Sequence, residues 1–214
     1  MDAATVVVKE SDSTAGQVLV LGGFTELNGT VSAVHLVDLA TGICTPQPNL
    51  LRARSLFVAA RLPDGCVICA GGLGDGVGCL QSTEILEPPV QGSLDAAWTW
   101  RALSALSVGR YGCMGCVLSD GRFAVLGGAN DNDEPMTSCE VLAVDDGEHW
   151  ELMSPMHDAR YGFAGAAVAG CIIVAGGYGL NSTEVFDEVL DRWLRLPYDL
   201  PLDGGICFMG SALL

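Results

Sequence analysis

The sequence predicts an all-β repeat protein, a β-propeller of about four four-stranded blades. The first observation is a glycine doublet that recurs at intervals of 49, 56 and 49 residues, each time directly after an apolar run. Self-similarity at a period near 50 residues is the signature of a repeat architecture. The second observation is that each period holds several short apolar or alternating segments between turn signals, without helical periodicity. The doublets are Gly22-Gly23, Gly71-Gly72, Gly127-Gly128 and Gly176-Gly177.

The fourth repeat shows the expected elements most clearly. Phe163–Val168 and Cys171–Ala175 are apolar segments joined by a turn at Ala169-Gly170, and Gly176-Gly177 ends the second of them. A third segment, Ser182–Asp187, follows a polar loop, and Arg192–Leu196 alternates polar and apolar residues as a half-buried outer strand does. Four short strands in a unit of this size are the blade of a propeller.

The other repeats follow the same order, and we divide the chain into repeats 1–50, 51–105, 106–156 and 157–200. Residues 201–214 resemble the first strand of a further blade, so the ring is expected to be incomplete and open. The strands expected in the first three repeats are Thr5–Lys9, Gln17–Leu21, Val31–Val37 and Gly42–Cys44; Ser55–Ala60, Cys66–Ala70, Ser82–Glu87 and Trp98–Ala102; Tyr111–Leu118, Arg122–Leu126, Ser138–Val144 and His149–Leu152.

The charge of the chain excludes some classes of partner. The formal net charge is −16, and Lys9 is the only lysine beside nine arginines. Nucleic acids and anionic membranes bind through clustered basic residues, so neither is expected as a partner. No apolar run approaches the ~20 residues of a membrane-spanning helix. The first residues lack the basic segment of a secretory signal, so a cytoplasmic location is expected.

Nine cysteines invite a metal or disulfide interpretation, which their placement disfavours. Cys66/Cys69 and Cys113/Cys116 match C-x-x-C, but the gap between the pairs is too long for a zinc ribbon. Both pairs lie in expected strands, where residues i and i+3 point to opposite faces. We therefore expect buried, reduced thiols and no metal site or cofactor.

The ordered residues of three repeats resemble the kelch repeat family. The shared pattern is an Arg before the first strand, Gly-Gly after the second, a Glu in the third, and a Trp in the fourth. The resemblance implies that the glycines, glutamates and tryptophans are structural, with the glutamates linking neighbouring blades and the tryptophans packing between them. The residues that carry the pattern are Arg54, Gly71-Gly72, Glu84 and Trp98 or Trp100; Arg110, Gly127-Gly128, Glu140 and Trp150; Arg160, Gly176-Gly177, Glu184 and Trp193.

The first repeat departs from the pattern. Val34 stands where the other repeats have Glu, and Cys44 stands where they have Trp. Kelch propellers usually close with six or seven blades, so four blades and one strand again imply an open ring.

Catalytic motifs are missing from the sequence. The glycine doublets lack the spacing of a phosphate-binding loop, and no Gly-x-Ser-x-Gly motif occurs. His35, His149 and His157 stand alone, without a partner at metal-ligand spacing. The protein is therefore expected not to be an enzyme.

Arg54, Arg110 and Arg160 share one position, just before each innermost strand, and two interpretations remain open. In the first, they form a ring at one mouth of the central channel and bind the carboxylates of an acidic, extended peptide. In the second, each arginine pairs with a glutamate of its own blade. Tyr178 and Asn181, in a loop after a glycine doublet, are further candidates for partner binding.

The resemblance implies a non-catalytic scaffold that binds a protein partner. Kelch domains often recruit substrates to ubiquitin ligases or bind cytoskeletal proteins, commonly beside an F-box or BTB segment that this sequence does not show. The alternative is a kelch-type propeller enzyme acting on a sugar or small molecule. Self-association through open blade edges is also expected.

Overall fold

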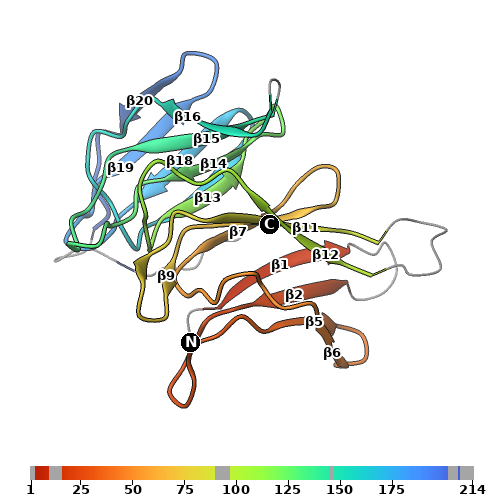
Figure 1. The fold of residues 1–214 in the computed structure, drawn as a ribbon. Coiled ribbons are helices and arrows are strands. Elements are labelled where there is room, and N and C mark those ends of the chain that lie inside the picture. Colours follow the sequence, from red (N-terminus) through yellow and green to blue (C-terminus); the bar gives the residue numbers. More distant parts are fainter. Residues whose placement is uncertain (1–2, 10–15, 90–96, 145–146, 202–206, 208–214) are drawn as a thin grey trace.

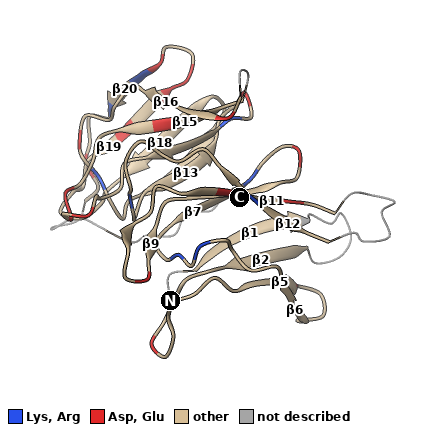
Figure 2. Cartoon of the chain, in the orientation of Figure 1, with Lys and Arg blue, Asp and Glu red and all other residues tan. Residues whose placement is uncertain are grey.

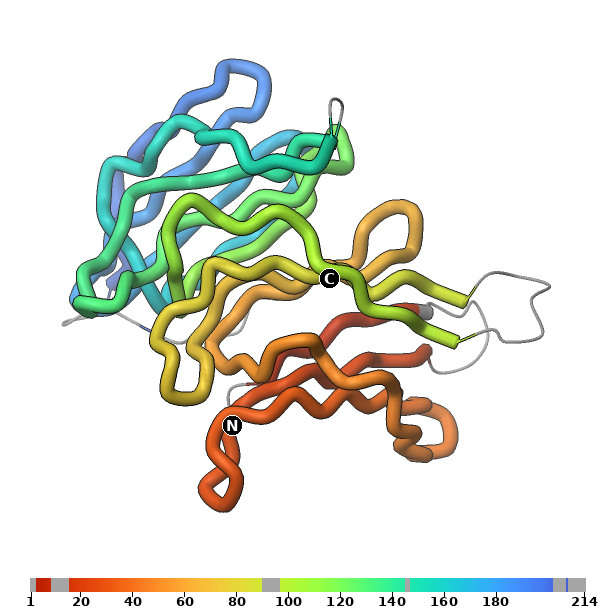
Figure 3. Tube along the Cα trace, viewed as in Figure 1, coloured from red at the N-terminus to blue at the C-terminus, as the bar shows by residue number. Residues whose placement is uncertain are grey.

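The computed structural model describes residues 3–9, 16–89, 97–144, 147–201 and 207, and every regular element in them is a β-strand. The strands form four four-stranded antiparallel sheets that follow one another in chain order (Figures 1 and 3). Among the described residues, no helix is long and apolar enough to cross a membrane. The strand expected within 201–214 falls outside the described residues, apart from positions 201 and 207.

Each sheet is one blade, and its strands are paired mostly in sequence order. Two additional two-stranded hairpins, which the sequence did not predict, lie in the loops after the first two glycine doublets. Blade 1 contains β1 (Ala4–Lys9), β2 (Gln17–Leu21), β5 (Val34–Asp38) and β6 (Cys44–Gln47); blade 2 contains β7 (Val58–Arg61), β8 (Val67–Ala70), β11 (Thr83–Glu87) and β12 (Thr99–Leu103); blade 3 contains β13 (Met114–Val117), β14 (Phe123–Leu126), β15 (Cys139–Ala143) and β16 (His149–Met153); blade 4 contains β17 (Ala164–Val168), β18 (Cys171–Ala175), β19 (Thr183–Asp187) and β20 (Arg192–Arg195); the hairpins are β3 (Phe24–Thr25) with β4 (Gly29–Thr30), and β9 (Leu73–Gly74) with β10 (Gly78–Cys79).

The blades form an open arc. Their innermost strands contact one another in the series β1–β7, β7–β13 and β13–β17, and the described residues show no comparable contact between β17 and β1. Figure 1 shows the four sheets fanned in this order, with the loops after the glycine doublets along one side of the molecule.

Three hydrophobic clusters fill the seams between neighbouring blades. In the seam between blades 3 and 4, Ala124 and Val141 of blade 3 pack against Ile172, Phe186 and Trp193 of blade 4. The seams between blades 1 and 2 and between blades 2 and 3 are built in the same way. Burying apolar side chains at ~25 cal/mol per Å² is the main source of stability, so each blade depends on its neighbour.

The last blade keeps one apolar face uncovered. Ile173 pairs with Val185, which pairs with Leu194, so the three side chains form a row across the sheet. The equivalent residues of blade 3, Ala124 and Val141, are buried under blade 4. Ile173 and Leu194 remain 40% and 43% exposed. This row is the surface on which a further blade would pack.

Cysteines at C-x-x-C spacing contribute to different seams. Cys113 packs against the cluster between blades 2 and 3, whereas Cys116 belongs to the cluster between blades 3 and 4. Burial raises the pKa of the Cys116 thiol to about 12, so the sulfur stays protonated and packs as an apolar atom. The two thiols therefore lie on opposite faces of their blade.

Candidate functional site

The three repeat arginines are buried inside the blades, which corrects the expectation of a binding ring. Arg54, Arg110 and Arg160 are each 0% exposed. A guanidinium that is sealed from solvent cannot bind a peptide, so the second interpretation, pairing within the blade, describes these residues.

Each arginine makes the same set of contacts in its blade. In blade 3, Nη1 of Arg110 donates to the carbonyl oxygens of Gly127 at 2.9 Å and Ser138 at 3.0 Å. Nη2 donates to Oγ of Ser138 at 3.2 Å and to Oε1 of Glu140 at 2.7 Å. These contacts neutralise a buried charge and tie the start of the blade to its second and third strands.

The same set recurs in blades 2 and 4. In blade 2, Arg54 donates to Gly71, Ser82 and Glu84. In blade 4 the contacts are extended, because Nη2 of Arg160 also reaches Asp158 at 3.4 Å.

The glutamates carry a second role that links blades. The other carboxylate oxygen accepts a backbone N–H from the segment that connects the preceding blade, namely from Leu51, Ser107 and His157 at 2.6, 2.9 and 2.8 Å. Each of Glu84, Glu140 and Glu184 thus binds the arginine of its own blade with one carboxylate oxygen and the connecting segment with the other, which links neighbouring blades.

At each seam, a tryptophan of the outermost strand forms a hydrogen bond to the preceding blade. The indole N–H groups of Trp100, Trp150 and Trp193 donate to the carbonyl oxygens of Pro48, Ser104 and Ser154, at 2.8 to 2.9 Å. Of the two alternatives in the second repeat, the repeat position belongs to Trp100 and not to Trp98, because Trp100 pairs with Leu86 as Trp150 pairs with Leu142. Trp98 is partly buried beside the seam between blades 1 and 2.

The first blade also differs from the expectation in its register. His35 pairs with Val20 as Glu84 pairs with Cys69, so His35 and not Val34 occupies the glutamate position. Val34 is buried in the seam between blades 1 and 2. A shift of one residue moves a side chain to the other face of a strand, which explains the difference.

An aromatic stack occupies the loop side where the arginine ring was expected. Tyr161 stacks on Tyr178 with ring centroids 5.3 Å apart, and its edge meets Tyr111 at 6.0 Å. The Tyr111 hydroxyl donates to Oδ1 of Asp133 at 2.7 Å. Burial, followed by this hydrogen bond, raises the pKa of Tyr111 above its usual value. Tyr178 is 65% exposed, so the stack opens to solvent.

The two remaining predicted binding residues differ in accessibility. Tyr178 is an exposed member of the stack, whereas Asn181 is half-buried and its carbonyl oxygen accepts the N–H of Leu200 at 2.8 Å. Tyr111 and Tyr161 were not predicted as binding residues. Their signal was the Arg-Tyr-Gly sequence that opens both repeats, at 110–112 and 160–162.

The loops after the glycine doublets, which lie on the same side of the molecule as the stack, are acidic as a group. These four loops contain five carboxylates, all in the first three loops, and no lysine or arginine, and Figure 2 shows acidic colour in these three loops. These carboxylates are Glu26, Asp75, Asp131, Asp133 and Glu134. Asp131 also links two loops, because its Oδ1 accepts the N–H of Cys79 at 2.6 Å.

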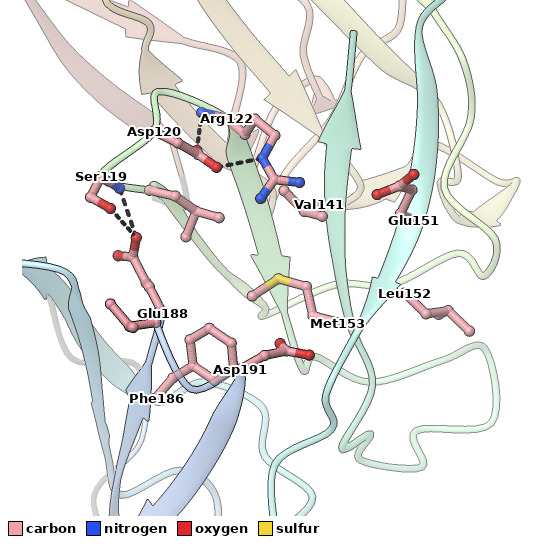
Figure 4. A pocket seen from close by; sticks show the side chains of 12 residues that line it. Ser119, Asp120, Arg122, Val141, Glu151, Leu152, Met153, Phe186, Glu188 and Asp191 are labelled. Carbon is pink, nitrogen blue, oxygen red and sulfur yellow. Dashed lines mark hydrogen bonds and ion pairs between the residues drawn. The ribbon is translucent and has the colours of Figure 1, made fainter. Parts of the chain in front are cut away.

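A pocket of about 330 Å³ lies between blades 3 and 4 (Figure 4). Its apolar side is made by Val141, Met153 and Phe186, and charged residues, among them Glu151 and Asp191, border it.

Two polar contacts brace this pocket. Glu188 accepts the N–H and the hydroxyl of Ser119 at 2.9 and 2.5 Å, and Arg122 donates Nε–H to Asp120 at 2.7 Å. Figure 4 shows both contacts at the rim. The first joins turns of neighbouring blades and the second stiffens one turn, so both have a structural role.

Known proteins with kelch repeats are similar to this chain in sequence, and a solved structure is similar to it in fold. Residues 159–198 match the family model of the Kelch motif. An F-box/kelch-repeat protein of Arabidopsis thaliana is 34% identical over 73 residues, which are 31% of this chain and 19% of that protein. The solved structure of YjhT is similar with a TM-score of 0.72 at 14% identity, over 96% of this chain and 68% of that one, which shows likeness of fold alone. The chain thus spans about a fifth of the plant relative. Residues 159–198 therefore carry a Kelch motif, and the same Arg–Ser–Glu contacts recur in three successive blades, so the described residues form an open, four-bladed propeller of kelch-like repeats.

Proposed function

We propose that this protein is a non-catalytic scaffold that binds a protein partner on its loop side. The observation that carries the proposal is the cluster of three tyrosines, in which half-buried Tyr111 and Tyr161 support the exposed Tyr178. These rings stand on loops that are held by the buried arginine contacts, so their position is fixed before a partner arrives. Tyrosine supplies a large contact area at a low cost in conformational entropy, which suits it to binding surfaces.

The location and pathway of such a scaffold are also proposals. A cytoplasmic location suits Cys69, Cys116 and Cys139, whose thiols are buried and packed as apolar side chains. Recruitment of substrates to a ubiquitin ligase is consistent with the name of the plant relative, which is an F-box protein. Because only a fifth of that relative is matched, an adaptor role requires an F-box or similar segment from a partner chain or from additional sequence.

A photo-crosslinking experiment tests the scaffold function. A benzophenone amino acid is placed at Tyr178, and separately at Val189, an exposed position in the turn between β19 and β20. We expect the same protein to crosslink reproducibly at position 178 and not at 189. Crosslinks at position 189 alone, or an equal pattern at both positions, would contradict binding on the loop side.

An enzyme acting on a sugar or small molecule is the second candidate, and the pocket between blades 3 and 4 favours it. Carboxylates are the groups that glycoside chemistry uses, and Glu151 and Asp191 border this pocket. The test is turnover of a panel of glycosides and free sugars. Turnover that is abolished by Glu151→Gln without loss of folding would support the enzyme and reverse the ranking.

A further inference from the structure

We propose that the loop side binds a cationic protein segment, with a lysine or arginine side chain held between the tyrosine stack and Asp133. This inference rests on the proposed scaffold function and names the chemistry of the partner. It replaces the acidic peptide that the sequence suggested. We call Tyr111, Tyr161, Tyr178 and Asp133 the tyrosine–aspartate patch.

The first argument is the nature of the exposed groups. The faces of aromatic rings carry a negative electrostatic potential and attract cations placed over them. Tyr161 and Tyr178 stack with an angle of 29° between their planes, so Tyr178, 65% exposed, presents an extended aromatic surface. An arginine guanidinium can stack on such a surface while its methylene groups cover the ring.

The second argument is the position of the carboxylate. Asp133 accepts the hydroxyl of Tyr111 and is exposed, so it has capacity to accept a further donor. Its φ of +59° lies in the left-handed region, within a turn where the N–H of Asp133 donates to the carbonyl oxygen of Asn130 at 3.0 Å. Asp133 is therefore held beside the aromatic rings by the turn and by Tyr111.

The third argument is charge complementarity. The five carboxylates in the loops after the glycine doublets, without a basic residue among them, favour a cationic segment and repel an acidic one. Arg52 is a basic side chain near this side, in a shallow pocket that also includes Asp131. Asp131 shares that pocket with Arg52 and already accepts the Cys79 N–H, so Asp133, beside the stack, is the carboxylate that we assign to the cation.

Matched peptides test the proposal directly. The probes are fluorescein-labelled octapeptides of alternating Arg and Gly, with citrulline or Glu in place of Arg. Citrulline keeps the shape of arginine and removes its charge. In fluorescence anisotropy at about 0.15 M salt, near physiological ionic strength, we expect the arginine peptide to bind at least tenfold more tightly than the citrulline peptide, and the glutamate peptide not to bind.

Variants separate the patch from the general acidity of the protein. Tyr178→Ala and Asp133→Asn should each reduce the preference for arginine over citrulline at least fivefold, while Tyr178→Phe retains it. The controls are Tyr198→Ala, an 83% exposed tyrosine after β20, and Glu151→Gln, an exposed carboxylate on β16. A melting temperature within about 2 °C of that of the parent protein certifies that each variant is folded, because so small a shift reflects only a small change in stability.

The outcomes are distinct. A preference for arginine that both patch variants reduce and both controls leave intact supports the proposal. A preference that Glu151→Gln reduces as much as Asp133→Asn shows non-specific charge attraction and overturns it. Tighter binding of the glutamate peptide, or saturable binding of a disaccharide with no arginine preference, also overturns it. If a protein crosslinks at position 178 but the arginine preference is missing, the scaffold function stands and this inference fails.

Discussion

Gly72 in blade 2 donates its backbone N–H to the carbonyl oxygen of Arg110 in blade 3 at 2.7 Å. The preceding residue, Gly71, is packed so closely that a Cβ there would lie 2.7 Å from the same oxygen. The same pair of contacts joins Gly22-Gly23 to Arg54 and Gly127-Gly128 to Arg160. The glycine doublet is thus an attachment point for the next blade, in addition to being a sharp end of a strand.

Replacing Gly71 with alanine should therefore destabilise the protein strongly. Its φ of +67° is unfavourable for other residues, at a cost of ~1 kcal/mol or more, and the clash with the Arg110 carbonyl adds to this. Gly42→Ala is the control, because Gly42 has a φ of +70° and a Cβ added there would meet no atom within 4 Å. Urea unfolding of both variants separates the two effects, and equal losses would argue against the inter-blade clash.

Removing one partner of a buried ion pair should be costly. Arg110→Met leaves Glu140 buried without its cation, and a loss of ~3–5 kcal/mol of unfolding free energy is expected. The double variant Arg110→Met with Glu140→Met should lose less than the sum of the single variants, because no unpaired charge remains. Chemical denaturation measures this coupling, and strictly additive losses would contradict a direct pair.

Stability should fall in acid through Glu184. Burial alone would raise the pKa of Glu184, but hydrogen bonds from the His157 backbone, the Arg160 side chain and the His157 side chain together lower it. A carboxyl whose pKa is lower in the folded state stabilises the protein above its unfolded pKa, near 4.5, and loses that contribution as the pH falls through the folded value. Melting temperatures measured from neutral pH down through this acid range should therefore fall less steeply for Glu184→Gln than for the parent protein.

Trp193 should contribute to stability through its seam. The side chain is 5% exposed, its ring centroid lies 5.2 Å from that of Phe186, and its indole donates to Ser154 at 2.9 Å. Trp193→Ala should cost ~3–5 kcal/mol, and Trp193→Phe should recover the packing but not the hydrogen bond. Tyr198→Ala, at an exposed aromatic position, is expected to leave the unfolding midpoint unchanged.

The uncovered row on blade 4 should promote self-association. Ile173, Val185 and Leu194 form an apolar row, and the blade 3 equivalents of the first two, Ala124 and Val141, are buried under blade 4. Ile173→Glu should weaken association in sedimentation velocity runs, whereas Leu152→Glu, at an exposed position of β16, should not. Small-angle scattering should give an open arc, and a closed four-bladed disc would refute this arrangement.

The strands and the glycine doublets were predictable from the sequence, because both depend on local chemistry. Alternating or continuous apolar segments specify strands through their period, and glycine marks positive φ at the end of an inner strand. Gln17–Leu21 and Cys171–Ala175 were predicted with the bounds that the structure has. The recurrence of Arg, Gly-Gly, Glu and Trp identified the repeat, because these residues make equivalent contacts in successive blades.

Register and side-chain direction were decided only by the tertiary structure. Val34 and His35 are adjacent in sequence, and only the pairing with β2 shows which one occupies the glutamate position. From the sequence, either Trp98 or Trp100 could be the repeat tryptophan of the fourth strand. The pairing of Trp100 with Leu86 shows that it is Trp100.

The sequence by itself determined that three arginines share one position, and the structure decided that they point into the blades. Their serine and glutamate partners lie 22 to 30 residues away, so no local pattern shows whether a guanidinium faces solvent or the sheet. The edge contact between Tyr111 and Tyr161 likewise joins two blades whose tyrosines are a full repeat apart. Contacts between repeats depend on how the blades pack, and that packing is a property of the whole arc.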